Sequence, residues 1–187
     1  MAPHHHYLSP RQFLPDRYTF YGASFQDLPA IVNLLNQRHI CSPAFSVEEL
    51  RLAWQTPDFN PAMDARLVFD PREQLVGFIQ VSLDCDWPLL WGCIHPDYEG
   101  HGIGSALLTW AESRVQLALD SLPVSNWSAP HFAALPVQRA QELCETLGWR
   151  QITPHPTEMK RVTGALHLPE NANRAVNVFE KAVNQLN

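Results

Sequence analysis

Residues 88–119, PLLWGCIHPDYEGHGIGSALLTWAESRVQLAL, constrain the fold more than any other part of the chain. The apolar run at 89–94 predicts a buried strand, and a turn at 95–97 follows it. A glycine-rich loop at 99–104 then leads into a helix that we expect to begin near Gly102. Apolar residues recur in this helix at steps of three and four, so one face can be buried along its length. They are Ile103, Ala106, Leu107, Trp110, Ala111, Val115 and Ala118.

The glycine loop is suited to binding an anion. Gly100, Gly102 and Gly104 permit positive φ angles and let backbone N–H groups approach a ligand closely. The following helix adds the N–H donors of its first turn and the positive end of its dipole. A diphosphate is therefore the ligand that this arrangement favours.

Two other kinds of nucleotide site and one structural alternative can be compared with these residues. An NTPase-type phosphate loop requires a lysine after the last glycine, and no lysine follows here. A dinucleotide-binding fingerprint can be placed on Gly100, Gly102 and Ser105, with Asp120 as the acidic residue. However, the loop does not directly follow the strand, and Asp120 would end the helix instead of following a second strand. The third alternative is a tight turn that only packs a helix on a sheet.

Two segments of the chain resemble a known family. The run IHPDYEGHGIGSALL at 94–108 resembles the acetyl-CoA-binding motif of the GNAT acetyltransferase superfamily, Val-x-Pro-x-x-Arg/Gln-Gly-x-Gly-x-Gly/Ala. The run AQELCETLGW at 140–149 resembles the family's Ala-x-x-Leu-Tyr-Glu-x-x-Gly-Phe. The resemblance covers about residues 18–162, and it extends to the front domain of two-domain acetyltransferases of the mycothiol-synthase kind.

The resemblance implies a cofactor site for acetyl-CoA as co-substrate. N–H groups at 100–105 would hold the diphosphate, and the strand near Cys93 and Ile94 would pair with the pantetheine arm. Asn126, on the strand expected beside this arm, is a candidate to bond the pantetheine or acetyl group, and the alternative is an ordinary polar strand residue. The implied cofactor-binding residues are Cys93, Ile94, Glu99, Gly100, His101, Gly102, Ile103, Gly104, Ser105 and Asn126. Glu99 departs from the motif, because a carboxylate stands where the family usually has Arg or Gln. This carboxylate should weaken diphosphate binding unless it points away.

Catalysis is less defined by the residues. Cys144 occupies the position of the tyrosine that often acts as the acid in the family, and a thiol with a pKa near 8.5 could protonate a leaving thiolate. A cysteine on an apolar helix face is more often a core residue. Candidates for the base, named by proximity alone, are Asp84, Asp86, His95, Glu99 and His101.

Two functions of different class therefore follow. The first is an N-acetyltransferase that moves an acetyl group from acetyl-CoA to an amine of a small molecule or protein. The second is a catalytically weak or inactive GNAT-like domain that serves as a CoA-binding or assembly module.

Composition excludes several other classes. The formal net charge of −6 argues against nucleic-acid binding, which requires a basic surface. No apolar run is long enough to span a membrane, and the first residues lack the apolar segment of a signal peptide, so we expect a cytoplasmic protein. The four cysteines form no Cys-x-x-Cys pair. We interpret the triplet at 4–6, HHH, as a solvated terminus or tag remnant and expect no metal site.

The remaining pattern predicts an α/β (α+β) fold with a single mixed, mostly antiparallel sheet flanked by helices. We expect an irregular arm at 1–15, a GNAT-like domain at 16–163 and a C-terminal tail at 164–187. Strands are expected at 18–21, 65–70, 74–83, 89–94, 122–129, 149–152 and 158–162, with Gly77 at a bulge or close approach. Helices are expected from 24, from 46 and at 136–147, with a loop at 56–62. An amphipathic helix at 171–186 would pack on the domain, and a homodimer contact is the alternative.

Overall fold

The computed structural model describes residues 14–37, 45–83, 87–121, 130–134, 138–153, 155–157, 159–160, 177–182 and 186. Within these residues the chain forms a seven-stranded sheet in the order β1-β2-β3-β4-β5-β7-β6. The strands are β1 (Thr19–Gly22), β2 (Ala65–Phe69), β3 (Leu75–Ser82), β4 (Leu89–Ile94), β5 (His131–Ala134), β6 (Arg150–Ile152) and β7 (Asn177–Glu180). Only the β4–β5 pair is parallel among these strands. The predicted mixed, mostly antiparallel sheet is therefore confirmed.

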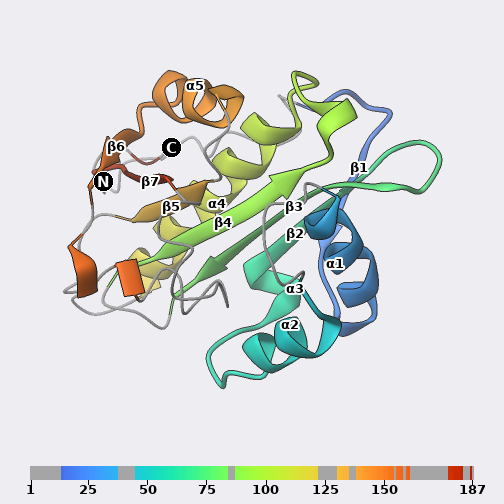
Figure 1. The fold of residues 1–187 in the computed structure, drawn as a ribbon, viewed down its shortest axis with the longest axis horizontal. Helices are drawn as coiled ribbons and strands as arrows, with labels where there is room; N and C mark the ends of the chain where they lie inside the picture. Colours follow the sequence, from blue (N-terminus) through green and yellow to red (C-terminus); the bar gives the residue numbers. More distant parts are fainter. Residues whose placement is uncertain are drawn as a thin grey trace, which may run out of the picture.

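Helices cover both faces of the sheet (Figure 1). They are α1 (Leu28–Asn36), α2 (Val47–Trp54), α3 (Pro61–Asp64), α4 (Ile103–Ser121) and α5 (Gln138–Thr146), with short 3₁₀ helices η2 (Phe25–Asp27) and η3 (Pro96–Tyr98). Helices α1 and α2 pack on one face in a cluster that includes Trp54, Phe78 and Trp91. Helix α4 packs on the other face, where Ile103 and Leu107 belong to a second cluster.

Local sequence explains where several elements begin. Ser46 starts α2 with a capping box, because its Oγ accepts the Glu49 N–H while the Glu49 carboxylate accepts the Ser46 N–H. The hairpin between β2 and β3 is closed by Asp70, whose Oδ1 accepts the N–H groups of Arg72 and Gln74. These patterns were sufficient to predict both elements.

Gly77 marks a bulge and a close approach, as predicted. The β2–β3 register shifts between Val68 and Phe69, which lie opposite Gly77 and Leu75. A Cβ atom on Gly77 would lie 2.7 Å from Cγ2 of Ile103. The missing side chain therefore lets the first turn of α4 sit directly on β3.

Several expectations differ from the structure. The predicted C-terminal helix is wrong for 177–180, which form β7 between β5 and β6. Buried Val178 and Phe179 pack on opposite faces of the sheet, and strand pairing on both edges outweighs the helical pattern. Residues 171–176 and 183–185 of that helix lie outside the described residues.

The strands expected at 122–129 and 158–162 and the loop expected at 56–62 also differ from the structure or lie partly outside the described residues. The strand expected at 122–129 lies outside the described residues, and β5 begins directly after Pro130, where a strand end was predicted. A strand was expected at 158–162, but Met159 and Lys160 are helical, and residues 158, 161 and 162 lie outside the described residues. The loop expected at 56–62 ends early, because Asn60 caps the short helix α3. None of the helices in the described ranges is long and apolar enough to cross a membrane.

Candidate functional site

A pocket of about 520 Å³ lies where β4, the glycine loop, α4 and α5 meet. Its lining includes Gly92, Cys93 and Ile94 of β4, and Glu99, Gly100, Gly102, Gly104 and Ser105 of the loop and the first turn of α4. Helix α5 forms the opposite wall with Arg139, Ala140, Glu142, Leu143 and Thr146. The two segments that carried the family resemblance thus face each other across one cavity.

The pocket follows the edge of β4 beyond the point where the β4–β5 register ends. That register covers Leu89 to Trp91, whereas the β4–β3 register continues to Ile94. Cys93 and Phe78 pack with the α1–α2 face, and Ile94 packs with the α4 face, yet all three line the pocket. The cavity therefore reaches both faces of the sheet at this edge.

The glycine loop adopts the backbone expected of an anion site. Gly100 and Gly102 both have φ +80°, a conformation that other L-residues adopt rarely. The carbonyl of Gly102 accepts the N–H of Ala106 at 3.0 Å and so begins the α4 ladder. The N–H groups at 103–105 belong to the first turn and have no partner within the helix. They lie beside the pocket, because Gly104 and Ser105 line it.

Gly104 is required for packing. A Cβ atom there would lie 2.7 Å from Cδ2 of Leu143 and 2.9 Å from Cδ1 of Ile94. Both neighbours line the pocket, so a larger residue at 104 would push side chains into the cavity. The close contact also sets the width between α4 and α5.

The outer side of the loop is held by a group of aromatic and polar side chains. Tyr98 donates its hydroxyl to Oδ2 of Asp70 at 2.6 Å, and this bond lowers the pKa of Asp70 and raises the pKa of Tyr98. The Tyr18 hydroxyl and Nδ1 of His101 lie 3.1 Å apart. These contacts tie the loop to Tyr18, the residue directly before β1, and to Asp70 in the turn between β2 and β3. His101 is exposed and faces Tyr18, and it does not line the pocket as described.

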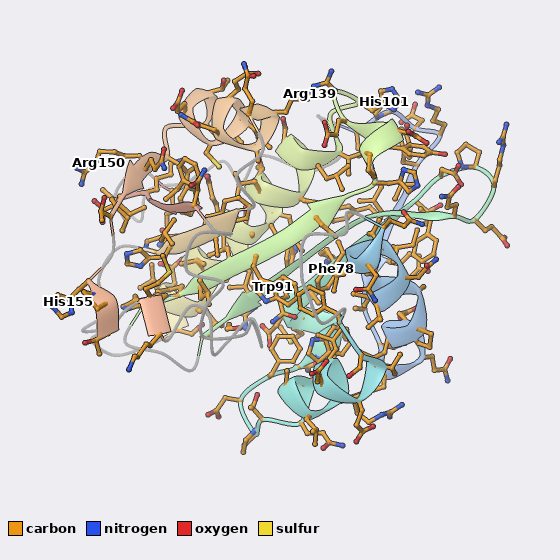
Figure 2. The ribbon with its side chains drawn as sticks, in the orientation of Figure 1. Phe78, Trp91, His101, Arg139, Arg150 and His155 are labelled. Atoms are coloured by element: carbon orange, nitrogen blue, oxygen red, sulfur yellow. The ribbon has the colours of Figure 1, made fainter. Side chains whose placement is uncertain are left out.

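Glu99 pairs with Arg139 across the pocket mouth. Nη1 of Arg139 lies 3.5 Å from Oε2 of Glu99, and both residues line the cavity. Figure 2 shows Arg139 and His101 at the same end of the molecule, while Trp91 and Phe78 lie towards α1 and α2. Sequence reasoning missed Arg139. The available signal was its position directly before Ala140, the first residue of the second family segment.

Cys144 lies in the core, as the second interpretation of this residue expected. Its side chain is fully buried in the α4-side cluster, and burial raises its thiol pKa to about 12. Leu143 and Thr146 line the pocket, and Cys144 is not among the described lining residues. A thiol with this pKa is a poor proton donor to a thiolate of ordinary basicity.

The remaining predicted residues are placed as follows. Ile103 is buried under the loop and packs on Gly77. Nδ1 of His95 accepts the N–H of Asp97 and so belongs to the turn η3. Asn126, Asp84 and Asp86 lie outside the described residues. The structure thus brings Cys93, Ile94, Glu99, Gly100, Gly102, Gly104 and Ser105 together at one pocket.

Comparisons with known proteins agree with this geometry. Residues 65–151 match the family model described as an acetyltransferase (GNAT) domain. A GCN5-related N-acetyltransferase from Sphaerobacter thermophilus aligns with TM-score 0.63 and 24% identity, over 74% of this chain and 45% of that protein. The chain thus spans less than half the length of that relative. No curated protein matches the sequence.

Two other solved structures align over most of both chains. The ribosomal-protein-S18-alanine N-acetyltransferase from Escherichia coli has TM-score 0.56 and 16% identity, over 87% of this chain and 90% of that one. The PaiA N-acetyltransferase from Thermoplasma acidophilum, solved with coenzyme A, has TM-score 0.58 and 13% identity, over 88% and 98%. The fold is therefore the GNAT fold, and its central part matches a GNAT acetyltransferase domain.

Proposed function

We propose that this chain is an N-acetyltransferase that uses acetyl-CoA as co-substrate and acetylates an amine of a small molecule or protein. One observation carries the proposal: a pocket along the edge of β4 ends at a loop with two left-handed glycines and the first turn of α4. A diphosphate fits the loop, because the chain has no side chain at Gly100 and Gly102, where backbone N–H groups must approach the ligand.

Each wall of the pocket has a proposed role. The loop and first turn of α4 hold the diphosphate of coenzyme A, and the strand near Cys93 and Ile94 runs along the pantetheine arm. Bound acetyl-CoA supplies an activated acyl group, a thioester. The acceptor amine is expected to approach from the α1–α2 face, because Phe78 and Cys93 of that face line the same cavity.

The reaction is a balanced acyl transfer. The amine nitrogen forms a bond to the carbonyl carbon, the bond from carbon to sulfur breaks, and the thiolate leaves with the electron pair. The amine loses one proton and the thiolate gains one, so no oxidant or metal is required. The chain assists by orienting the two reactants, which lowers the entropic part of the barrier.

A second function is kept because of Cys144. The position at which the family often has its acid tyrosine holds a fully buried thiol with a raised pKa. A domain that binds coenzyme A without efficient transfer, as a binding or assembly module, would keep the loop and lose the acid. Four expectations from the sequence stay predictions: the resemblance to a two-domain acetyltransferase, the domain boundaries, a homodimer and the cytoplasmic location.

The test combines binding and turnover. Acetyl-CoA is titrated into the protein by calorimetry, and thiol release is then followed with a panel of small amines and peptide N-termini. Binding with amine-dependent thiol release supports the enzyme. Binding without release across the panel supports the module, and absence of binding contradicts the enzyme.

A further inference from the structure

We propose that Arg139 is a diphosphate-binding residue, and that Glu99 competes with the diphosphate for its guanidinium. The inference rests on the proposed use of coenzyme A and adds a residue that neither family segment specifies. It also gives Glu99, the departure from the motif, a definite role.

The described lining of the pocket holds more negative than positive side chains. Three ionisable carboxylate or guanidinium groups occur in the described lining: Glu99, Glu142 and Arg139. A diphosphate placed here would meet two carboxylates and one cation. Backbone N–H groups supply partial charges, so the full positive charge nearest to the loop is that of Arg139 among the described lining residues.

The position of Arg139 carries the second step. Its Nη1 atom lies 3.9 Å from the place that a Cβ atom would take on Gly100. The guanidinium therefore stands beside the loop whose N–H groups are proposed to hold the diphosphate. Glu142 is engaged by its own helix, where its Oε1 accepts from Nε2 of Gln138 at 2.8 Å.

The guanidinium of Arg139 can leave the Glu99 carboxylate and bind the diphosphate. The Arg139 side chain is 64% exposed and the Glu99 side chain 18% exposed, and the contact between them is 3.5 Å long. Because the guanidinium stays largely in solvent and the contact is longer than a hydrogen bond, the pair contributes little to stability and Arg139 can change partner at low cost. A guanidinium can bind phosphate oxygens with two parallel charge-assisted hydrogen bonds, which are stronger than that pair. The diphosphate should therefore take Arg139 from Glu99.

The experiment measures coenzyme A affinity by calorimetry for the wild type and for Arg139→Gln, Glu99→Gln and the double variant. We expect Arg139→Gln to bind coenzyme A about tenfold more weakly, because it loses a charge-assisted contact at an exposed site. Glu99→Gln should bind several-fold more tightly, because Arg139 then has no competing carboxylate. The double variant should bind more tightly than Arg139→Gln, because the carboxylate that repels the diphosphate is gone.

Two controls separate this inference from other effects. Arg150→Gln removes the same charge from β6, where Arg150 pairs with Glu180 away from the pocket, and should leave affinity unchanged. Pantetheine lacks both the diphosphate and the 3′-phosphate, so its weaker binding should be the same in wild type and Arg139→Gln. 3′-Dephospho-coenzyme A keeps the diphosphate, so it should still bind about tenfold more weakly to Arg139→Gln than to the wild type. The affinity of Arg139→Gln should also fall less steeply with salt than that of the wild type.

The outcomes are distinguishable. If the wild type does not bind coenzyme A, the proposed function fails. If the wild type binds and Arg139→Gln binds equally well, the function stands and the role of Arg139 is refuted. If Glu99→Gln weakens binding, Glu99 positions Arg139 instead of competing for it, and the proposed exchange is overturned.

Discussion

A buried ion pair behind the site gives the sharpest prediction on stability. Nζ of Lys181, directly after β7, lies 2.9 and 3.0 Å from the two carboxylate oxygens of Glu112 on α4. The indole Nε1 of Trp149 donates to the same carboxylate at 2.7 Å. Lys181 is 5% exposed, Trp149 2% and Glu112 1%. The group therefore joins the end of β7, the residue before β6 and α4 inside the core.

Replacing Lys181 with methionine keeps most of the side-chain length and removes the charge. The carboxylate of Glu112 would then remain buried without its cation, which costs about 3–5 kcal/mol of unfolding free energy. In a chain of this size each kcal/mol lowers the melting temperature by about 2–4 °C, so the expected decrease is about 6–20 °C. The double variant Glu112→Gln/Lys181→Met removes both charges and should recover most of the loss.

Urea and thermal unfolding, followed by tryptophan fluorescence, measure these differences. Arg150→Gln is the matched control, because it breaks a more exposed pair with Glu180, one residue before Lys181, and should cost no more than about 1 kcal/mol. The reasoning is refuted if Lys181→Met unfolds within about 1 kcal/mol of the wild type. It is also refuted if the double variant is as unstable as Lys181→Met.

Three further predictions concern the site. Iodoacetamide should alkylate Cys93 of the native protein, and coenzyme A should slow this reaction. Cys144 is buried and its thiol pKa is raised, so it should react only after denaturation. Peptide mass spectrometry measures both reactions, and equal rates in the native protein would contradict the burial of Cys144. Tyr98→Phe should destabilise the protein at neutral pH, because it removes the hydrogen bond that lowers the pKa of Asp70. The ionised carboxylate of Asp70 is stabilised in the folded state only, so this contribution is complete above the ordinary carboxyl pKa of about 4 and disappears as pH falls through the lower folded value. The difference between Tyr98→Phe and wild type, measured by urea unfolding, should therefore shrink below about pH 4; a constant difference would show that the bond does not carry it. Gly102→Asp should reduce coenzyme A affinity by more than about tenfold, because it places a strained, charged residue in the loop. Gly102→Ala is the uncharged comparison. Unchanged affinity of Gly102→Asp would contradict the position of the diphosphate.

The central part of the fold was predictable because its signals are local. The apolar run of β4, the glycines of the loop and the apolar stripe of α4 lie within 32 consecutive residues, and the structure has each element at the expected place. Capping at Ser46 and the hairpin at Asp70 follow from neighbouring residues in the same way. For these elements propensity, turn chemistry and packing agree.

The misses depend on contacts between distant segments. Val178 and Phe179 fit the apolar pattern of a helix as well as that of a strand. They form a strand because β7 pairs with β5 on one side and with β6 on the other. Arg139 gains its meaning from Glu99, which is 40 positions earlier in the sequence and 3.5 Å away in space. From the sequence, Cys144 fits both the position of an acid and that of a core residue, and its burial supports the second interpretation.

The place of β7 affects how the pocket is assembled during synthesis. Strand β6 pairs with β7, and β7 links it to the rest of the sheet, although β7 is made last of the seven described strands. While the ribosome still holds residues 177–182, β6 lacks that link, and α5, which precedes it and forms one wall of the pocket, lacks its support. Nascent chains should therefore complete this wall of the pocket only after β7 has emerged from the ribosome.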